Sequence, residues 1–339
     1  MPAEWEAHAA TWLAWPHEKT DWPGKFPPIP WVYADIVRHL SGVERVRILA
    51  ANAGAERTIR GILKKAGANL SAVEFFHVPT NRGWIRDFGP IFVENEKGET
   101  AVTNWHFNAW AKYDDWKKDD SVNDRLAQKL KWKQWRPEFR RRRIVLEGGS
   151  IDVNGCGTLL TTQECLLSPV QSRNPGLTRD ELGEIFRNYL GASNVLWLKN
   201  GIAGDDTHGH VDDLARFVNA TTIVTVIENN PAEANYDPLQ ENLALLRTMR
   251  DQDNRPLRVE TLPMPAPLYF DRQRLPASYA NFYIANQMVL VPTFNDPNDR
   301  VALAKMAELF PGRKIIGIAC LDLVLGLGTI HCMTQQEPA

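Results

Sequence analysis

Apolar residues recur at helical spacing in five stretches of the chain, and each stretch is followed by a run with the composition of a β-strand. The five helix-and-strand pairs cover 55–67 and 73–79, 121–132 and 143–149, 178–191 and 194–200, 238–251 and 257–265, and 298–312 and 314–328. The third helix has clear boundaries, because Thr178 and Glu181 stand at capping-box spacing and a glycine follows the last turn. Helices and strands that alternate in this way predict an α/β fold.

Two further pairs of strands are predicted between these units, at 150–162 and 215–228. In the first pair, Asn154-Gly155 is a favoured two-residue hairpin turn. The units recur about every 60 residues, which favours quasi-repeats around an axis, with a doubly wound sheet as the alternative. The chain has no obvious linker, and we expect residues 1–339 to form a single domain.

The first 31 residues contain five tryptophans among several prolines. We expect an ordered irregular segment here. Indole faces attract cations, but large aromatic side chains more commonly pack, so most of these tryptophans are expected in the core.

Composition limits the classes of function. The 339 residues are 44% hydrophobic, enough for a core that buries about 75% of the unfolded chain's surface. The 39 basic and 41 acidic residues leave a formal charge of −2, so no general attraction for nucleic acid or anionic membranes is expected. No apolar run approaches the roughly 18 residues of a membrane span. The arginines of 140–143 are interpreted as a solvated edge.

The four cysteines, Cys156, Cys165, Cys320 and Cys332, show no framework spacing, and the start of the chain lacks the regions of a signal peptide. We therefore expect a cytoplasmic protein. The sequence leaves the oligomeric state open and does not exclude a homo-oligomer.

Polar, glycine-containing loops follow four of the predicted units, at 81–90, 147–150, 204–213 and 326–336. Loops that leave equivalent strand ends meet at one face of an α/β fold, so we expect these four to converge. The last loop carries Cys332, which follows two glycines and stands beside His331. A thiol readily becomes a nucleophile near neutral pH, and glycines allow close backbone approach, so Cys332 is the candidate nucleophile rather than a merely buried cysteine.

The loops at 81–90 and 147–150 each contribute a carboxylate. Asp87 follows an apolar pair and precedes Gly-Pro, so its carboxylate is expected on a rigid turn, where it needs a cationic partner. An internal ion pair with Arg82 or Arg86 is the alternative to a ligand. Glu147 ends an apolar run before two glycines, a poor position for core packing, and the alternative role is a loop cap.

The loop at 204–213 has two histidines and four aspartates in ten positions. If 209–213 is extended, His208, His210 and Asp212 point to the same side, as a base and a carboxylate would for one substrate. The same run resembles an H-x-H-x-D zinc motif, and a zinc-dependent hydrolase is the competing interpretation. Only one of the eight histidines follows His210, so a dinuclear site lacks ligands. A mononuclear site completed by carboxylates or Cys332 stays open.

A thiol, a histidine and several carboxylates form an unusual set for acyl transfer, because the negative charge disfavours both a thiolate and an oxyanion. Around a guanidinium the same carboxylates bind a planar cation through paired, charge-assisted hydrogen bonds. The residues therefore indicate a small cationic guanidine as the substrate.

Four of the motifs are WIRDFGP (84–90), LEGGSIDVNGCGTLLTT (146–162), GHVDD (209–213) and GLGTIHCMTQQEP (326–338). PAEWEAHAATWLAWP precedes them, and FNAWAKY lies between the first two. In this order and combination they resemble the agmatine deiminase and bacterial peptidyl-arginine deiminase family, over nearly the whole chain. The resemblance implies a pentein fold, in which five αβ units surround a pseudo-fivefold axis.

The resemblance also implies a role for each matching residue. It assigns Cys332 as the nucleophile, His210 as the general acid and base, Asp87 and Asp212 as the guanidinium-binding pair, and Glu147 as the supporting carboxylate. Trp84, in the same motif as Asp87, is a further candidate for substrate binding. It leaves His208 and His331 outside this set and implies no cofactor and no metal. Agmatine deiminases usually read NDxW before the RD pair, whereas this chain has Arg82 in that motif.

The implied reaction is hydrolysis of agmatine to N-carbamoylputrescine and ammonia through a covalent cysteine intermediate. Peptidyl-arginine or another guanidine is the alternative substrate within the family. The peptidyl-type relatives are secreted with extra domains, and the absence of both features here favours a small free guanidine. A guanidine-binding or amidino-transferring protein of the same shape is the alternative outside hydrolysis.

Overall fold

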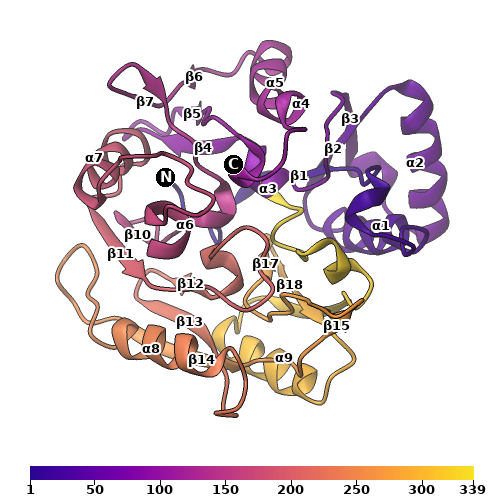
Figure 1. The fold of residues 1–339 in the computed structure, drawn as a ribbon. Helices are drawn as coiled ribbons and strands as arrows, with labels where there is room; N and C mark the ends of the chain where they lie inside the picture. Colours follow the sequence, from indigo (N-terminus) through magenta and orange to yellow (C-terminus); the bar gives the residue numbers. More distant parts are fainter.

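The computed structural model describes residues 1–339, with five sheets of three or four strands and two short hairpins. Figure 1 shows the sheets following one another in chain order round the ribbon, from indigo to yellow. The helices are α1 (Ile29–Leu40), α2 (Ala53–Ala66), α3 (Ile85–Phe88), α4 (Lys117–Asp120), α5 (Val122–Leu130), α6 (Gln163–Leu167), α7 (Arg179–Leu190), α8 (Tyr236–Leu246) and α9 (Asn298–Leu309).

The first ten strands are β1 (His8–Ala14), β2 (Arg45–Ala50), β3 (Val73–His77), β4 (Ile91–Glu94), β5 (Thr100–Thr103), β6 (Gln134–Trp135), β7 (Glu138–Phe139), β8 (Arg142–Arg143), β9 (Asp152–Val153) and β10 (Thr158–Thr162). The others are β11 (Asn194–Leu198), β12 (Ala215–Asn219), β13 (Thr222–Ile227), β14 (Arg258–Pro263), β15 (Tyr269–Phe270), β16 (Gln273–Arg274), β17 (Tyr283–Ile284), β18 (Met288–Thr293), β19 (Lys314–Ala319) and β20 (Gln335–Pro338).

Each of the five sheets repeats one pattern. A middle strand pairs antiparallel with one neighbour and parallel with another, as β13 does with β12 and β14. At least one helix connects the parallel pair, such as α8 between β13 and β14. The first sheet adds β3 and takes β20 from the end of the chain, in the order β20-β1-β2-β3. The predicted α/β fold is confirmed.

Local sequence explains why these elements start and stop where they do. The capping box predicted at α7 is present, because the Thr178 side chain accepts from the Glu181 amide and the Glu181 carboxylate accepts from the Thr178 amide. Gly191 ends this helix at φ 70°, a left-handed conformation that glycine adopts without strain. Both predicted hairpins form, as β9–β10 and β12–β13.

Three predictions of local structure were wrong. The turn between β9 and β10 has four residues, 154–157, rather than two, because the Asn154 side chain accepts hydrogen bonds from the amides of Cys156 and Thr158 and widens the turn. The strand expected at 143–149 is reduced to β8, because β6 has already filled the place beside β5. The irregular segment expected at the start contains β1, which lies in the middle of the first sheet.

The main core contains 67 buried residues drawn from nearly the whole chain. Trp12 and Trp22 are fully buried in it, as expected for most of the early tryptophans, whereas Trp31 is 48% exposed. Arg140 and Arg141 form the exposed turn of the β7–β8 hairpin, and Arg142 and the half-buried Arg143 form β8 itself. None of the helices has both the length and the apolar composition needed to cross a membrane.

Candidate active site

Five of the residues singled out in the sequence meet at one buried place, although they come from four separate loops. Asp87 lies in α3, and Glu147 lies directly before the short helix Gly148–Ser150. His210 and Asp212 lie at the start of the short helix Val211–Asp213, and Cys332 lies between α9 and β20. The backbone also links these loops, since the amide of Arg86 donates to the carbonyl of Cys332 over 3.1 Å. The predicted convergence of the loops is confirmed.

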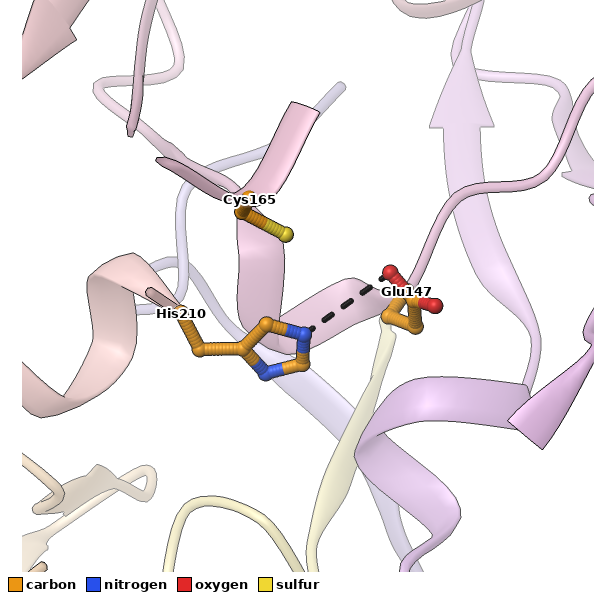
Figure 2. A group of neighbouring side chains, drawn as sticks. All are labelled: Glu147, Cys165 and His210. Atoms are coloured by element: carbon orange, nitrogen blue, oxygen red, sulfur yellow. Dashed lines mark ion pairs between the residues drawn. The ribbon is translucent and has the colours of Figure 1, made fainter. Parts of the chain in front are cut away.

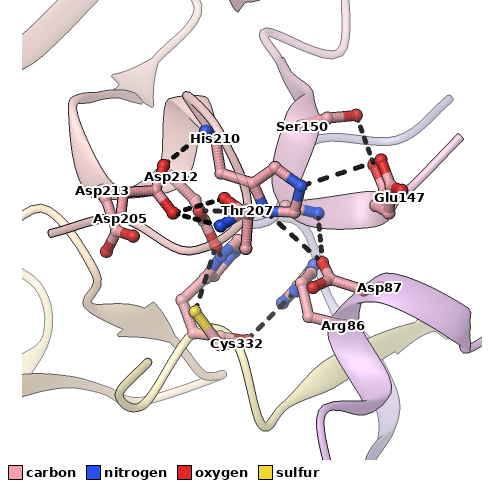
Figure 3. Close-up of polar contacts among 12 residues, drawn as sticks. Arg86, Asp87, Glu147, Ser150, Asp205, Thr207, His210, Asp212, Asp213 and Cys332 are labelled. Atoms are coloured by element: carbon pink, nitrogen blue, oxygen red, sulfur yellow. Dashed lines mark hydrogen bonds and ion pairs between the residues drawn. The ribbon is translucent and has the colours of Figure 1, made fainter. Parts of the chain in front are cut away.

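His210 lies between the carboxylates. Its Nε2 atom is 3.7 Å from Glu147 Oε2, and a dashed line marks this ion pair in Figure 2. Its Nδ1 atom is 3.7 Å from Asp87 Oδ1 and 4.0 Å from Asp212 Oδ1 (Figure 3). Burial opposes protonation of the ring, but Asp87 and the other neighbours outweigh it and hold the pKa of His210 well above its ordinary value.

Gly149 allows these groups to come so close. A Cβ atom on Gly149 would lie 2.6 Å from His210 Nδ1, 2.8 Å from Asp87 Oδ1 and 3.1 Å from Asp212 Oδ2. The amide of Gly149 also donates to Asp87 Oδ1 over 3.1 Å. Any side chain at this position would therefore fill the space between the histidine and the two aspartates.

The segment at 209–213 is not extended, contrary to the expectation from the sequence. The Asp205 carboxylate accepts hydrogen bonds from the amides of Gly209 and His210, over 2.7 and 3.0 Å. These bonds fold the loop into a turn. Gly209 has a φ of 93°, a value that favours glycine. The turn still directs His210 and Asp212 into the site, but His208 points elsewhere, with its Nε2 atom 3.1 Å from Ser168 Oγ. The two histidines of the H-x-H-x-D run therefore do not converge.

Glu147 is fully buried and paired with a residue that the sequence did not reveal. Arg173 Nε donates to both carboxylate oxygens of Glu147, over 3.1 and 3.3 Å. Burial alone would raise the pKa of Glu147, but Arg173 and His210 outweigh it and lower that pKa to about 2. Glu147 makes no capping hydrogen bond to the helix that follows it, so the alternative role as a loop cap is wrong.

Asp87 has no arginine partner. Arg86 pairs with Glu4 instead, and Arg82 pairs with Asp21 and Asp115. The internal ion pair that would have explained Asp87 is therefore absent. The carboxylate of Asp87 accepts from Trp110 Nε1 over 2.8 Å.

The surroundings of Cys332 disfavour a thiolate while the site is empty. Burial raises the pKa of the thiol well above its ordinary value, and the nearby Asp212, Asp213 and Asp87 raise it further. The sulfur lies 3.8 Å from Asp212 Oδ2. One donor faces it, because Asn281 Nδ2 lies 3.1 Å from Sγ.

A cavity of about 430 Å³ leads to these groups, and Asp87 and Cys332 belong to its lining. Trp84 forms part of the wall, with its Nε1 atom donating to Asp21 Oδ2 over 3.1 Å. Arg82 also lines the cavity, and its guanidinium lies 4.5 Å from the ring centroid of Tyr113. The cavity therefore connects solvent with the Cys332 sulfur and the neighbouring carboxylate of Asp87.

The family described as Porphyromonas-type peptidyl-arginine deiminase matches residues 1–338. The chain belongs to this family. The agmatine deiminase of Pseudomonas aeruginosa (strain LESB58) is 35% identical over 362 residues, covering 100% of this chain and 95% of that protein. Membership places the chain among hydrolases that act on the C–N bonds of guanidino groups.

Solved structures of the family agree with this assignment. The C. jejuni agmatine deiminase with substrate bound has a TM-score of 0.88 and 32% identity, covering 99% of this chain and 95% of that one. The agmatine deiminase of Enterococcus faecalis has a TM-score of 0.91 and 31% identity, covering 100% and 95% of the two chains.

Several members of the site were missed in the sequence. Arg173 and Asn281 stand alone in stretches without dense charge or glycine, so no local pattern marks them. Trp110 lies in the FNAWAKY motif, and Asp213 ends GHVDD, so these two stood in recognised motifs but received no role. His331 was set aside, yet it contacts Asp212 directly.

Proposed function

We propose that this deiminase-family protein hydrolyses agmatine and water to N-carbamoylputrescine and ammonia, a reaction that would serve putrescine formation. The observation that carries the proposal is a set of buried polar atoms without partners beside a nucleophile. Asp212 Oδ1 and both ring nitrogens of His210 have no hydrogen-bond partner in the protein. A planar cation with several N–H donors would satisfy the oxygen and bring its carbon toward Cys332.

Asp87 and Asp212 hold the guanidinium and keep it cationic, so its carbon stays electrophilic, while Trp84 lies alongside in the cavity wall. The bound cation offsets the negative charge around Cys332, so the thiol loses its proton to solvent and the thiolate attacks the guanidinium carbon. Nδ1 of His210, which faces the aspartates, donates its proton to the departing nitrogen, and ammonia leaves. An S-alkylthiouronium bonded to Cys332 remains.

Hydrolysis of this intermediate completes the reaction. His210, now neutral, takes a proton from a water that attacks the same carbon, and the carbon–sulfur bond breaks. The ureido product leaves with the water oxygen, and Cys332 is regenerated. Glu147 supports both steps, because its carboxylate faces Nε2 and stabilises the protonated ring. No step requires a metal or a cofactor.

The charges in the cavity are compatible with an ammonium tail. Arg82, which departs from the usual family motif, is neutralised by Asp21 and Asp115. Lys112, the other cation of the lining, pairs with Asp206. A guanidine with a carboxylate tail is the second candidate. Arg82 would be available to pair with that carboxylate if Asp115, whose side chain is half-buried, released it.

We propose further that the whole chain is one pentein domain, with its five sheets related by a pseudo-fivefold axis. The repeated pattern of an antiparallel and a helix-connected parallel partner in each sheet supports this arrangement. A cytoplasmic location fits a small, free guanidine substrate.

A substrate panel tests the proposed function. Purified protein is incubated with agmatine, free arginine, a peptidyl-arginine and a guanidine with a carboxylate tail, and ammonia and ureido product are measured. We expect agmatine to give the highest kcat/KM and N-carbamoylputrescine in a one-to-one ratio with ammonia. Preference for peptidyl-arginine or the carboxylate-bearing guanidine would overturn the agmatine assignment. Turnover only with an added acceptor amine would indicate an amidino-transferring protein.

A further inference from the structure

A second cysteine lies beside His210 and Glu147. Cys165 belongs to α6, is fully buried and is a free thiol. Its sulfur, His210 and Glu147 each offer a ligand atom, and these atoms all lie within 4.8 Å of one another (Figure 2). The proposed reaction makes no use of this thiol.

These three ligand types match a zinc ion. Zinc binds thiolate sulfur at about 2.3 Å and imidazole nitrogen or carboxylate oxygen at about 2.0–2.2 Å, so ligand atoms on one tetrahedral ion stand about 3.3–3.8 Å apart. Nε2 of His210 and Oε2 of Glu147 are already 3.7 Å apart. Sγ of Cys165 lies within 4.8 Å of both atoms, so a small inward movement of the sulfur, by rotation of the Cys165 side chain or a shift of α6, is enough to complete the site.

A second observation points independently to a ligand here. His210 is 1% exposed, yet neither of its ring nitrogens has a hydrogen-bond partner. Buried polar groups are normally paired, and an imidazole nitrogen without a partner is available to bind a metal ion. The Nε2 atom faces Glu147, so an ion that displaces the Nε2 proton would bind on the side of the cluster rather than toward the cavity.

We propose that Cys165, His210 and Glu147 form an inhibitory site for Zn²⁺ or a similar thiolate-preferring divalent ion. On binding, the Cys165 thiol and Nε2 of the protonated His210 ring each release a proton to solvent, and the ion forms bonds to Sγ, to Nε2 and to one Glu147 oxygen. Solvent occupies the fourth position. Neighbouring Asp87 and Asp212 favour the ion, whereas Arg173, which stays paired with Glu147, opposes it.

Inhibition follows from the chemistry of the ring. An imidazole with a metal on Nε2 carries one proton, on Nδ1, and the loss of that proton would leave an imidazolate anion. The metal-bound ring is therefore a much weaker acid than the imidazolium that protonates the departing nitrogen in the proposed mechanism. The inhibition rests on the proposed deiminase function, whereas binding of the ion does not. The zinc suggested by the H-x-H-x-D run would then bind to different ligands and would stop the reaction rather than support it.

One competing cluster must be separated from this site. Asp212, Asp213 and Cys332 also bring three ligand atoms within 4.8 Å of one another. Each cluster contains one cysteine, so cobalt distinguishes them. Co²⁺ bound to a thiolate has a sulfur-to-metal charge-transfer band in the near ultraviolet, and this signal requires no turnover.

The experiment titrates Co²⁺ into the full-length protein and into the variants Cys332→Ala, Cys165→Ala and Cys156→Ala, with the exposed Cys156 as the matched control. We expect the band in the wild type, in Cys332→Ala and in Cys156→Ala, and its loss in Cys165→Ala. Zn²⁺ should abolish the band and inhibit agmatine turnover, and a chelator should reverse the inhibition. Inhibition is expressed relative to each variant's own metal-free rate, and Cys165→Ala should need at least tenfold more Zn²⁺.

Cys165→Ser provides a second variant if the alanine form does not fold. Absence of the band in the wild type would overturn the proposal, as would a band that disappears in Cys332→Ala and persists in Cys165→Ala. A correct band pattern in a protein that does not turn over agmatine would sustain the metal site and overturn only the proposed function.

Discussion

Nδ1 of His331 lies 2.7 Å from Oδ2 of Asp212, and both side chains are buried. The other ring nitrogen of His331 is 2.8 Å from Oε2 of Glu4, so the histidine bridges two carboxylates. His331 occupies one oxygen of Asp212 and leaves Oδ1 free to receive a guanidinium. Burial opposes ionisation of Asp212, but His331 outweighs it and lowers the pKa of this carboxyl group.

Replacement of His331 tests whether this bridge positions Asp212. In His331→Asn, we expect kcat/KM for agmatine to fall by about 10–100-fold, the equivalent of a charged hydrogen bond worth roughly 1.5–3 kcal/mol. Much of the loss should be a higher KM, because Asp212 binds the guanidinium and does not attack its carbon. His208→Asn is the matched control, since His208 contacts Ser168 instead. Equal kinetics in the two variants would contradict the positioning role.

A methyl group at position 149 should obstruct the substrate without disturbing the rest of the fold. In Gly149→Ala, the added Cβ would stand between His210, Asp87 and Asp212, so we expect agmatine turnover to fall at least a hundredfold. Gly183→Ala in α7 is the control, because a Cβ there meets nothing within 4 Å and alanine favours a helix by about 1 kcal/mol. Thermal unfolding and steady-state kinetics of both variants measure the effect. An active Gly149→Ala enzyme would show that the substrate lies elsewhere.

The environment of Cys332 predicts selective alkylation. Because burial and three aspartates raise the pKa of its thiol, neutral iodoacetamide should react slowly at neutral pH. A cationic haloacetamidine should label Cys332 rapidly, and agmatine should protect it. Mass spectrometry of labelled peptides identifies the modified cysteine. Similar rates for the two reagents, without protection, would contradict the proposed cation site.

Binding of the guanidinium should weaken in acid. Burial raises the pKa of Asp87 to about 6, with Asp212 and Glu147 adding to the effect and His210 opposing it. The cation requires the ionised carboxylate, so binding is complete above this pKa and is lost as the pH falls through it, by up to about tenfold per pH unit. Calorimetry with agmatine and Cys332→Ala measures binding without turnover. In Cys332→Ala/Asp87→Asn, binding should be weaker throughout and this acid limb should be absent.

Much of the fold and of the chemistry could be predicted from the sequence, because these features depend on residues close together in the chain. The capping box joins Thr178 and Glu181, which are only three positions apart, and the alternation of helices and strands needs only local periodicity. The glycine loops likewise marked Asp87, Glu147 and Cys332 as exceptions to core packing. The predicted backbone conformation was wrong at two places where a nearby side chain accepts hydrogen bonds from backbone amides. Asn154 does so in the turn before β10, and Asp205 does so at Gly209.

The tertiary structure alone decided the partners of these residues. Glu4 and His331 are 327 positions apart, and Arg173 and Glu147 belong to different loops, so no spacing in the sequence could bring either pair together. Nor could the sequence show that Arg82 and Arg86 turn away from Asp87, which leaves that carboxylate for a ligand. A helix cap lies at a fixed spacing along the chain, but the partner of a charged side chain does not. The electrostatic energy of an ion pair depends on the distance between its charges and on their burial. The sequence determined which groups were available, and the fold determined which of them remain unpaired.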